Sequence, residues 1–204
     1  MIKDKQSDPL SLASLQAGDR AEFAKMVDAY SSMIYRVGLK MLNNPQDAED
    51  VLQETFIKAF RNLDRFDGRA NVSTWLYRIA TNEALMLLRK KRPESVSVET
   101  PWAGDDDEQE PLQIIDWCCL PENELMSTEV REYLDQAADK LPASLKVVFV
   151  LRDIEGLSTR ETANVLDISE TAVKTRMSRA RFRLREELTM YFSERVEGYL
   201  DGTQ

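Results

Sequence analysis

Residues 156–188 read GLSTRETANVLDISETAVKTRMSRARFRLREEL, and they contain the strongest local signals of structure in the chain. Ser158 and Glu161 have the spacing of a capping box, which predicts the start of a short helix. A break at Asp167-Ile168-Ser169 follows, and Ser169 can cap a second helix. Apolar residues repeat along one face of that helix, at Val173, Met177, Ala180, Leu184 and Leu188. The pattern predicts a helix-turn-helix.

The outer face of the second helix is polar and basic. Six positive charges and no acid lie between residues 174 and 185. A helix of this kind fits the major groove of DNA, where Lys, Arg, Ser and Thr side chains reach base edges and phosphates. The same pattern also occurs in adaptor modules and helical hairpins, so a solvated helix face is the alternative.

Charge is distributed unevenly along the chain, whose net charge is −9. Between Arg92 and Arg131 there are eleven acidic residues and no basic one, while the remainder has 27 basic against 25 acidic residues. The acidic strip contains several prolines and no sustained helical period, which is typical of an extended linker. The asymmetry indicates that another part of the chain contacts nucleic acid.

Helical patterns flank the acidic strip on both sides. Before it, Asp19 and Glu22 have capping-box spacing, and Pro45 fits the first position of a further helix whose apolar stripe includes Phe60. After it, residues 147–151 could form a buried strand, but the helical period of their neighbours favours a helix.

We therefore predict an all-α protein with two small helical domains joined by an acidic flexible linker, the second domain containing the helix-turn-helix. The predicted boundaries are an N-terminal extension at 1–18, a helical domain at 19–92, the linker at 93–120, the helix-turn-helix domain at 121–190 and a C-terminal tail at 191–204.

Composition excludes several functional classes. The chain has no His, and its two Cys are adjacent at Cys118-Cys119, which excludes His-based catalysis and His/Cys zinc sites. It has no Gly-rich phosphate loop or nucleophile constellation, so we expect no enzyme activity, catalytic residue, metal or cofactor. No apolar run approaches the roughly 20 residues of a membrane-spanning helix, and the N-terminus lacks the apolar core of a signal peptide. We expect a cytoplasmic protein without membrane insertion.

Four short motifs stand out in the two helical blocks. They are DIEGLSTRETA at 153–163, AVKTRMSRAR at 172–181, DAEDVLQETFIKAF at 47–60, and TWLYRIA at 74–80 with Phe66, Gly68 and Asn82 nearby. The first two resemble region 4 of the extracytoplasmic-function (ECF, group 4) RNA polymerase sigma factors. The third resembles region 2.2 of that family and the fourth resembles region 2.3.

The resemblance implies a dissociable subunit that directs bacterial RNA polymerase to specific promoters. Such a subunit recognises the minus-ten and minus-thirty-five elements and promotes DNA melting. Its implied partners are the polymerase core, through the clamp coiled coil and the flap, promoter DNA, and an anti-sigma factor. The rival interpretation is a stand-alone helix-turn-helix regulator with an N-terminal partner-binding domain.

By the resemblance, a polar helix face docks on the clamp coiled coil through Asp50, Gln53, Glu54 and Lys58. An ordinary solvated helix surface is the alternative. The acidic linker would thread through the polymerase toward its active-site cleft, where anionic residues can occupy a channel built for RNA phosphates. A solvated tether is the alternative for the linker, although Trp102 and Trp117 are possible docking points.

Phe66, Gly68 and Asn82, with the loop 67–73, resemble the family's reader of the minus-ten element, in which an unstacked base is held in a pocket. A packed interhelical loop is the alternative. Trp75 can lie near the melting fork, but a core position is its alternative. The basic side chains expected on phosphates, or else simply at a helix C-terminus, are Arg78, Arg89, Lys90, Lys91 and Arg92.

For the minus-thirty-five element, the resemblance implies four side chains that face DNA: Lys174, Thr175, Ser178 and Arg179. It also implies that Arg176 and Arg160 contact the DNA backbone. Two positions depart from the family pattern. Thr171-Ala172 stands where Gly-Thr is common, so a hydroxyl contact with phosphate is shifted or missing. Asp167 stands where Gly is frequent, but Asp tolerates left-handed backbone better than most residues, so we expect the turn to form.

Overall fold

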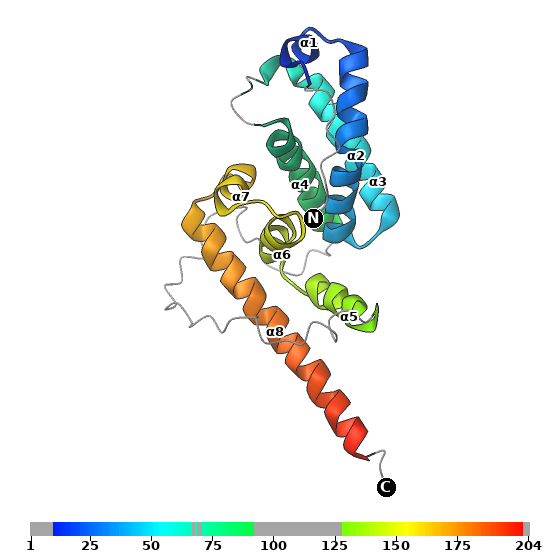
Figure 1. Cartoon of the computed structure of the whole chain (residues 1–204), viewed down its shortest axis with the longest axis vertical. Coiled ribbons are helices and arrows are strands. Elements are labelled where there is room, and N and C mark those ends of the chain that lie inside the picture. Colours follow the sequence, from blue (N-terminus) through cyan, green and yellow to red (C-terminus); the bar gives the residue numbers. More distant parts are fainter. Residues whose placement is uncertain (1–9, 67, 69–70, 92–127, 202–204) are drawn as a thin grey trace.

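The computed structural model describes residues 10–66, 68, 71–91 and 128–201, and every regular element among them is helical. Figure 1 shows a bundle formed by the first block and a second block that lies against it. The predicted all-α class is confirmed. The expected linker, with Trp102, Trp117 and Cys118-Cys119, lies outside the described residues.

The first block contains α1 (Leu12–Gln16), α2 (Arg20–Leu42), α3 (Pro45–Arg61), the 3₁₀ turn η1 (Leu63–Arg65) and α4 (Val72–Lys91). The side chain of Asp19 caps α2, as its position predicts. Asn43 ends α2 in the left-handed conformation, and Asn44 then caps α3, which has Pro45 at its first position. Three consecutive residues therefore determine the sharp change of chain direction between α2 and α3.

Helices α2 and α3 pack closely because α2 has a glycine at the crossing. A Cβ atom at Gly38 would lie 3.1 Å from Cα of Ala48, which is tighter than ordinary van der Waals contact. The surrounding core includes the fully buried side chains of Ile34, Met41 and Val51. Phe60 was predicted on the buried stripe, and this prediction is wrong: Phe60 is 48% exposed. It lies at the edge of the stripe, where its ring packs edge-on against the ring of Phe23, with centroids 5.0 Å apart.

The second block contains α5 (Thr128–Asp139), α6 (Ala143–Phe149), the π-helical turn η3 (Val150–Ile154), α7 (Thr159–Leu166) and α8 (Glu170–Asp201). Helical structure at 143–154 excludes the buried strand that the sequence left open. Both hydrogen bonds of the capping box between Ser158 and Glu161 are present. Asp167 ends α7 with φ 58° and ψ 45°, so the left-handed turn forms without glycine. Helix α8 continues past residue 190, where the sequence suggested a separate tail.

The two blocks share one apolar core. It joins buried residues of α2 and α4 to buried residues of the second block, among them Val37, Leu85, Val148, Leu151 and Leu166. A smaller cluster lies between α5, α6 and α8 and includes Ala137, Leu141 and Leu184. The first block thus packs against α6, η3 and α7, while most of α8 extends away from it (Figure 1).

Candidate nucleic-acid interface

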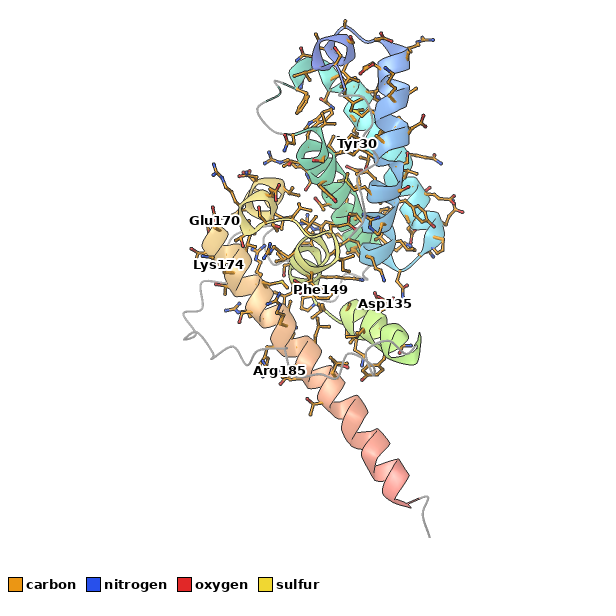
Figure 2. The ribbon with its side chains drawn as sticks, viewed as in Figure 1. Tyr30, Asp135, Phe149, Glu170, Lys174 and Arg185 are labelled. Atoms are coloured by element: carbon orange, nitrogen blue, oxygen red, sulfur yellow. The ribbon has the colours of Figure 1, made fainter. Side chains whose placement is uncertain are left out.

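The N-terminal part of α8 presents a polar face to solvent. Lys174, Thr175 and Ser178 are exposed, whereas Val173 and Met177 on the opposite face are buried, as the periodicity predicts. Figure 2 shows Glu170 and Lys174 at the N-terminal end of α8, beside α7. This face has the shape and the donor groups for insertion into a DNA groove.

The remaining basic residues of this region differ in exposure. Arg160 on α7 is exposed, while Arg176 and Arg179 on α8 are half-buried. Arg181 is bound to Asp153 of η3, with Nη2 2.9 Å from Oδ1, and this pair attaches α8 to the preceding turn. Arg181 therefore supports the position of α8, and Lys174 is the exposed cation nearest its N-terminus.

A second group of predicted residues gathers on one face of α4. Trp75, Arg78 and Asn82 are three and four positions apart, a spacing that places them side by side on a helix. Arg78 and Asn82 are exposed, and Trp75 is half-buried and packs against the core. Gly68 is exposed and has φ 72°, a conformation that favours glycine.

Phe66 does not offer its ring to solvent. It is only 6% exposed, and its ring stacks on Trp75 with centroids 4.6 Å apart and an interplanar angle of 22°. The packed-loop alternative thus describes the Phe66 side chain, which supports one side of Trp75. The side-chain amide of Gln16 donates a 2.6 Å hydrogen bond to the Phe66 carbonyl, and no local pattern predicts a contact between residues fifty positions apart.

The outer face of α3 carries three exposed polar residues of the predicted docking set, Asp50, Gln53 and Glu54. The fourth, Lys58, is half-buried and its Nζ lies 2.5 Å from Oε1 of Glu83 on α4. Ile57 belongs to the same exposed side of α3 and is 41% exposed. The α3 surface therefore combines polar groups with apolar ones, a combination favourable for protein association.

Glu155, at the end of η3, joins the two blocks. Its carboxylate accepts hydrogen bonds from Nε and Nη2 of Arg36 at 2.5 and 2.6 Å and from the Tyr77 hydroxyl at 2.9 Å. The Glu155 side chain is 1% exposed. Burial, and then the negative charge of Glu155, raise the pKa of Tyr77, while the hydrogen bond from Arg36 to Glu155 raises the pKa of Arg36.

Arg78 also contacts the second block. Its Nη2 lies 3.1 Å from Oδ2 of Asp167, the residue in the turn of the helix-turn-helix. Both side chains are substantially exposed, so this ion pair contributes little to stability. It nevertheless brings a residue of the predicted minus-ten group next to the element that carries the predicted minus-thirty-five group.

Comparison with known proteins decides the family. The family model for sigma-70 region 2 matches residues 26–94, and the model for sigma-70 region 4 matches residues 131–184. The ECF RNA polymerase sigma factor SigW of Bacillus subtilis is 39% identical over 177 residues, which cover 87% of this chain and 94% of SigW. The chain belongs to the ECF sigma factors. The ECF sigma-E factor of Haemophilus influenzae is 32% identical over 182 residues, covering 88% of this chain and 94% of that protein.

Solved structures agree with this assignment. CnrH, in a structure of its complex with the cytosolic domain of CnrY, is 26% identical with a TM-score of 0.63, covering 88% of this chain and 95% of CnrH. The sigma factor RpoE of Bartonella quintana, crystallised with the anti-sigma factor NepR, has the same fold with a TM-score of 0.58, 23% identity, and coverage of 82% of this chain and 97% of RpoE.

This ECF sigma factor directs RNA polymerase to promoters in transcription initiation, and the alternative of a stand-alone regulator is not favoured. Within the described ranges of the sigma factor, no cluster of three or more His, Cys, Asp or Glu residues could hold a metal ion. None of the helices in those ranges is both long and apolar enough to cross a membrane.

Proposed function

We propose that this sigma factor reads its promoter with two separate faces, one on α8 and one on α4. The observation that carries this assignment is the exposure of two compact sets of hydrogen-bonding side chains on different blocks, each on a single helix face. The proposed domains at 19–92 and 121–190 lie within the two blocks, which also include α1 and the end of α8. The protein itself performs no chemical step and needs no cofactor, and it acts where the polymerase acts, in the cytoplasm.

The α8 face takes the minus-thirty-five element. Lys174, Thr175 and Ser178 contact base edges or phosphates in the major groove, with Arg179 at the border of the face. The exposed Arg160 of α7, and Arg176, contact the DNA backbone. A groove-inserted helix flanked by cations on the backbone is the usual docking arrangement of a helix-turn-helix.

The α4 face takes the minus-ten element. Asn82 supplies donor and acceptor groups, Arg78 a cation for a phosphate, and Trp75 an aromatic surface at the edge of the melted region. Phe66 does not contact DNA and instead supports the ring of Trp75 by stacking on it. Gly68 has no side chain that would prevent a base from approaching the backbone. The ion pair of Arg78 with Asp167 must break when Arg78 binds DNA. This costs little free energy because both side chains are exposed.

The α3 face docks on the clamp coiled coil of the polymerase core. Asp50, Gln53 and Glu54 provide polar contacts, and the ion pair of Lys58 with Glu83 holds Lys58 at the border of the face. The second block sits on the flap. Since CnrH and RpoE were solved with CnrY and with the anti-sigma factor NepR, respectively, we also expect this chain to have an anti-sigma partner.

Run-off transcription tests this proposal. Core polymerase from the source organism would transcribe a promoter-DNA library with and without the protein. Promoter-specific initiation that requires the protein, and that the double variant Lys174→Ala/Arg179→Ala loses, is the expected result. If the protein bound duplex DNA unaided and never directed initiation, the stand-alone regulator would replace the proposal.

A further inference from the structure

The short helix α1 lies directly against the start of the proposed minus-ten loop. Gln16, the last residue of α1, donates its 2.6 Å hydrogen bond to the carbonyl of Phe66, fifty residues further along the chain. At the other end of α1, Cδ2 of Leu12 occupies the space beside Gly68, only 2.3 Å from where a Cβ atom would stand. Two side chains from one helix thus contact the described residues at the beginning of the loop.

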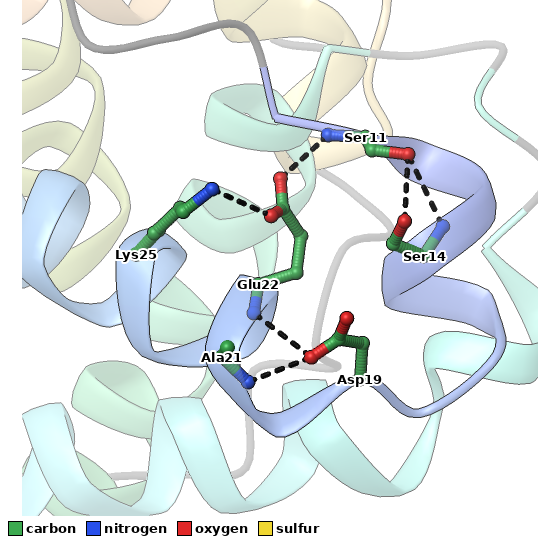
Figure 3. A network of polar contacts seen from close by, with 6 residues as sticks. All are labelled: Ser11, Ser14, Asp19, Ala21, Glu22 and Lys25. Atoms are coloured by element: carbon green, nitrogen blue, oxygen red, sulfur yellow. Dashed lines mark hydrogen bonds and ion pairs between the residues drawn. The ribbon is translucent and has the colours of Figure 1, made fainter.

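Helix α1 is itself fixed firmly to the bundle. Leu15 is fully buried in the core. The backbone N–H of Ser11, the N-cap of α1, donates a 2.7 Å hydrogen bond to the Glu22 carboxylate, and Lys25 binds the same carboxylate at 3.1 Å. Asp19 caps α2 from the connecting turn through the N–H groups of Ala21 and Glu22 (Figure 3).

Two of these polar contacts are made to the carboxylate of Glu22. The Ser11 N–H and the Lys25 ammonium lower the pKa of Glu22, so its carboxylate stays charged at neutral pH and keeps both partners. Helix α1 therefore has a defined position on α2. A hydrogen bond from a side chain of α1 therefore also fixes the position of its acceptor relative to α2.

The residue that Gln16 binds is in direct contact with Trp75. Phe66 follows η1, and its ring stacks on Trp75. Trp75 in turn lies on the face of α4 that carries Arg78 and Asn82. Displacement of the Phe66 backbone would move its ring and remove the support on one side of Trp75.

We infer that α1 holds the minus-ten reader in its binding geometry, with Gln16 and Leu12 as positioning residues that act through Phe66 and Gly68. The inference rests on the proposed function of the α4 face and adds to it a part of the chain that the family models do not cover, since the region 2 match begins at residue 26. Gln16 fixes a backbone carbonyl, and Leu12 fills the space beside the glycine that the loop requires.

The test uses two substitutions of Gln16 and matched controls. Gln16→Ala removes the donor, and Gln16→Glu keeps the shape but places an acceptor against the Phe66 carbonyl. Gln46→Ala and Gln46→Glu make the same changes at an exposed position in the first turn of α3. The controls therefore account for the change in charge and for the loss of an amide.

The first measurement is binding of holoenzyme to a fluorescent single strand carrying the non-template minus-ten region of a promoter selected by run-off transcription. We expect Gln16→Ala to weaken binding about 2- to 10-fold, as for the loss of one hydrogen bond, and Gln16→Glu to weaken it more. Affinity for core polymerase should stay unchanged in all four variants. Equal effects at positions 16 and 46, or a parallel loss of polymerase affinity, would overturn the inference.

The second measurement does not depend on DNA binding. In a Trp102→Phe/Trp117→Phe background, Trp75 is the sole tryptophan, and acrylamide quenching of its fluorescence reports its exposure. We expect Gln16→Ala to increase quenching and Gln46→Ala to leave it unchanged, whereas equal quenching would contradict the inference. If wild-type holoenzyme failed to bind the strand, the proposed function would fail, and the quenching result would still decide whether α1 positions Trp75.

Discussion

Arg36 of α2 and Glu155, the C-cap of η3, form a bidentate ion pair between the two blocks, with nitrogen–oxygen distances of 2.5 and 2.6 Å. The arginine is partly exposed, whereas the carboxylate is enclosed and receives a third hydrogen bond from Tyr77. At the contact between the blocks, one buried carboxylate thus receives three hydrogen bonds. Other polar contacts across the same boundary, such as that of Lys40 with Asp135, are more exposed.

Removal of the charge at Glu155 should loosen the contact between the blocks. Glu155→Gln leaves Arg36 without its anion in a partly enclosed position, and we expect a loss of about 1–3 kcal/mol. Asp135→Asn removes an exposed pair across the same boundary and should cost about 0–1 kcal/mol. Thermal unfolding gives the stabilities, and small-angle scattering gives the radius of gyration, which should grow only for Glu155→Gln. Equal behaviour of the two variants would show that Glu155 does not hold the blocks together.

Tyr77 makes this contact sensitive to alkaline pH. Its raised pKa means that the folded protein keeps the phenol proton to a higher pH than the unfolded chain does, in which tyrosine ionises near about pH 10. The contribution of Tyr77 to the free energy of unfolding is therefore complete below that pH and decreases as the pH rises above it. Absorbance at 295 nm should show one tyrosine that ionises after the others, and Tyr77→Phe should abolish this late step. A late step that persists in Tyr77→Phe would assign it to another tyrosine.

The α3 face can be tested apart from DNA. Glu54→Lys reverses a charge at the centre of the proposed docking face and should raise the dissociation constant for core polymerase about tenfold or more. Asp28→Lys makes the same reversal at an exposed position of α2 and should change it less than about twofold. Fluorescence anisotropy of labelled protein with core polymerase measures both. Similar losses for the two variants would indicate a general charge effect instead of a specific face.

The close packing of α2 on α3 predicts a cost for the smallest possible side chain at Gly38. Gly38→Ala gains helix propensity, but its Cβ meets the backbone of Ala48, and we expect a net loss of about 1–3 kcal/mol. Ser32→Ala, at an exposed position of the same helix, should be neutral or stabilising by about 0.5 kcal/mol. Thermal unfolding of the two variants decides the point. An increase in Tm for Gly38→Ala would mean that the helices separate at little cost.

Local signals in the sequence were sufficient for the elements that surround the helix-turn-helix. The capping box at Ser158 and Glu161, the left-handed Asp167 and the inward face of α8 depend on neighbours within a few positions, so spacing predicts them. The same holds for Asn43, Asn44 and Pro45 between α2 and α3. These features place Lys174, Thr175 and Ser178 on the exposed face of α8, whereas Arg176 and Arg179 of the same predicted set are half-buried.

Contacts between distant segments were beyond the reach of periodicity. The bond of Gln16 to Phe66 spans fifty residues, and that of Arg36 to Glu155 spans 119. Nothing in the pattern around Glu155 distinguishes a buried acid from an exposed one at a helix end. Position on the stripe also failed for Phe60, because the width of the covered face depends on the neighbouring helices.

Two faces that read two promoter elements independently should each respond to the loss of one element alone. Initiation rates would be compared on a selected promoter and on two derivatives in which either the minus-ten or the minus-thirty-five element is scrambled. We expect Lys174→Ala holoenzyme to become insensitive to scrambling of the minus-thirty-five element only, and Asn82→Ala holoenzyme to scrambling of the minus-ten element only. If each variant lost activity to the same extent whichever element was scrambled, the two faces would not be separate readers of the promoter.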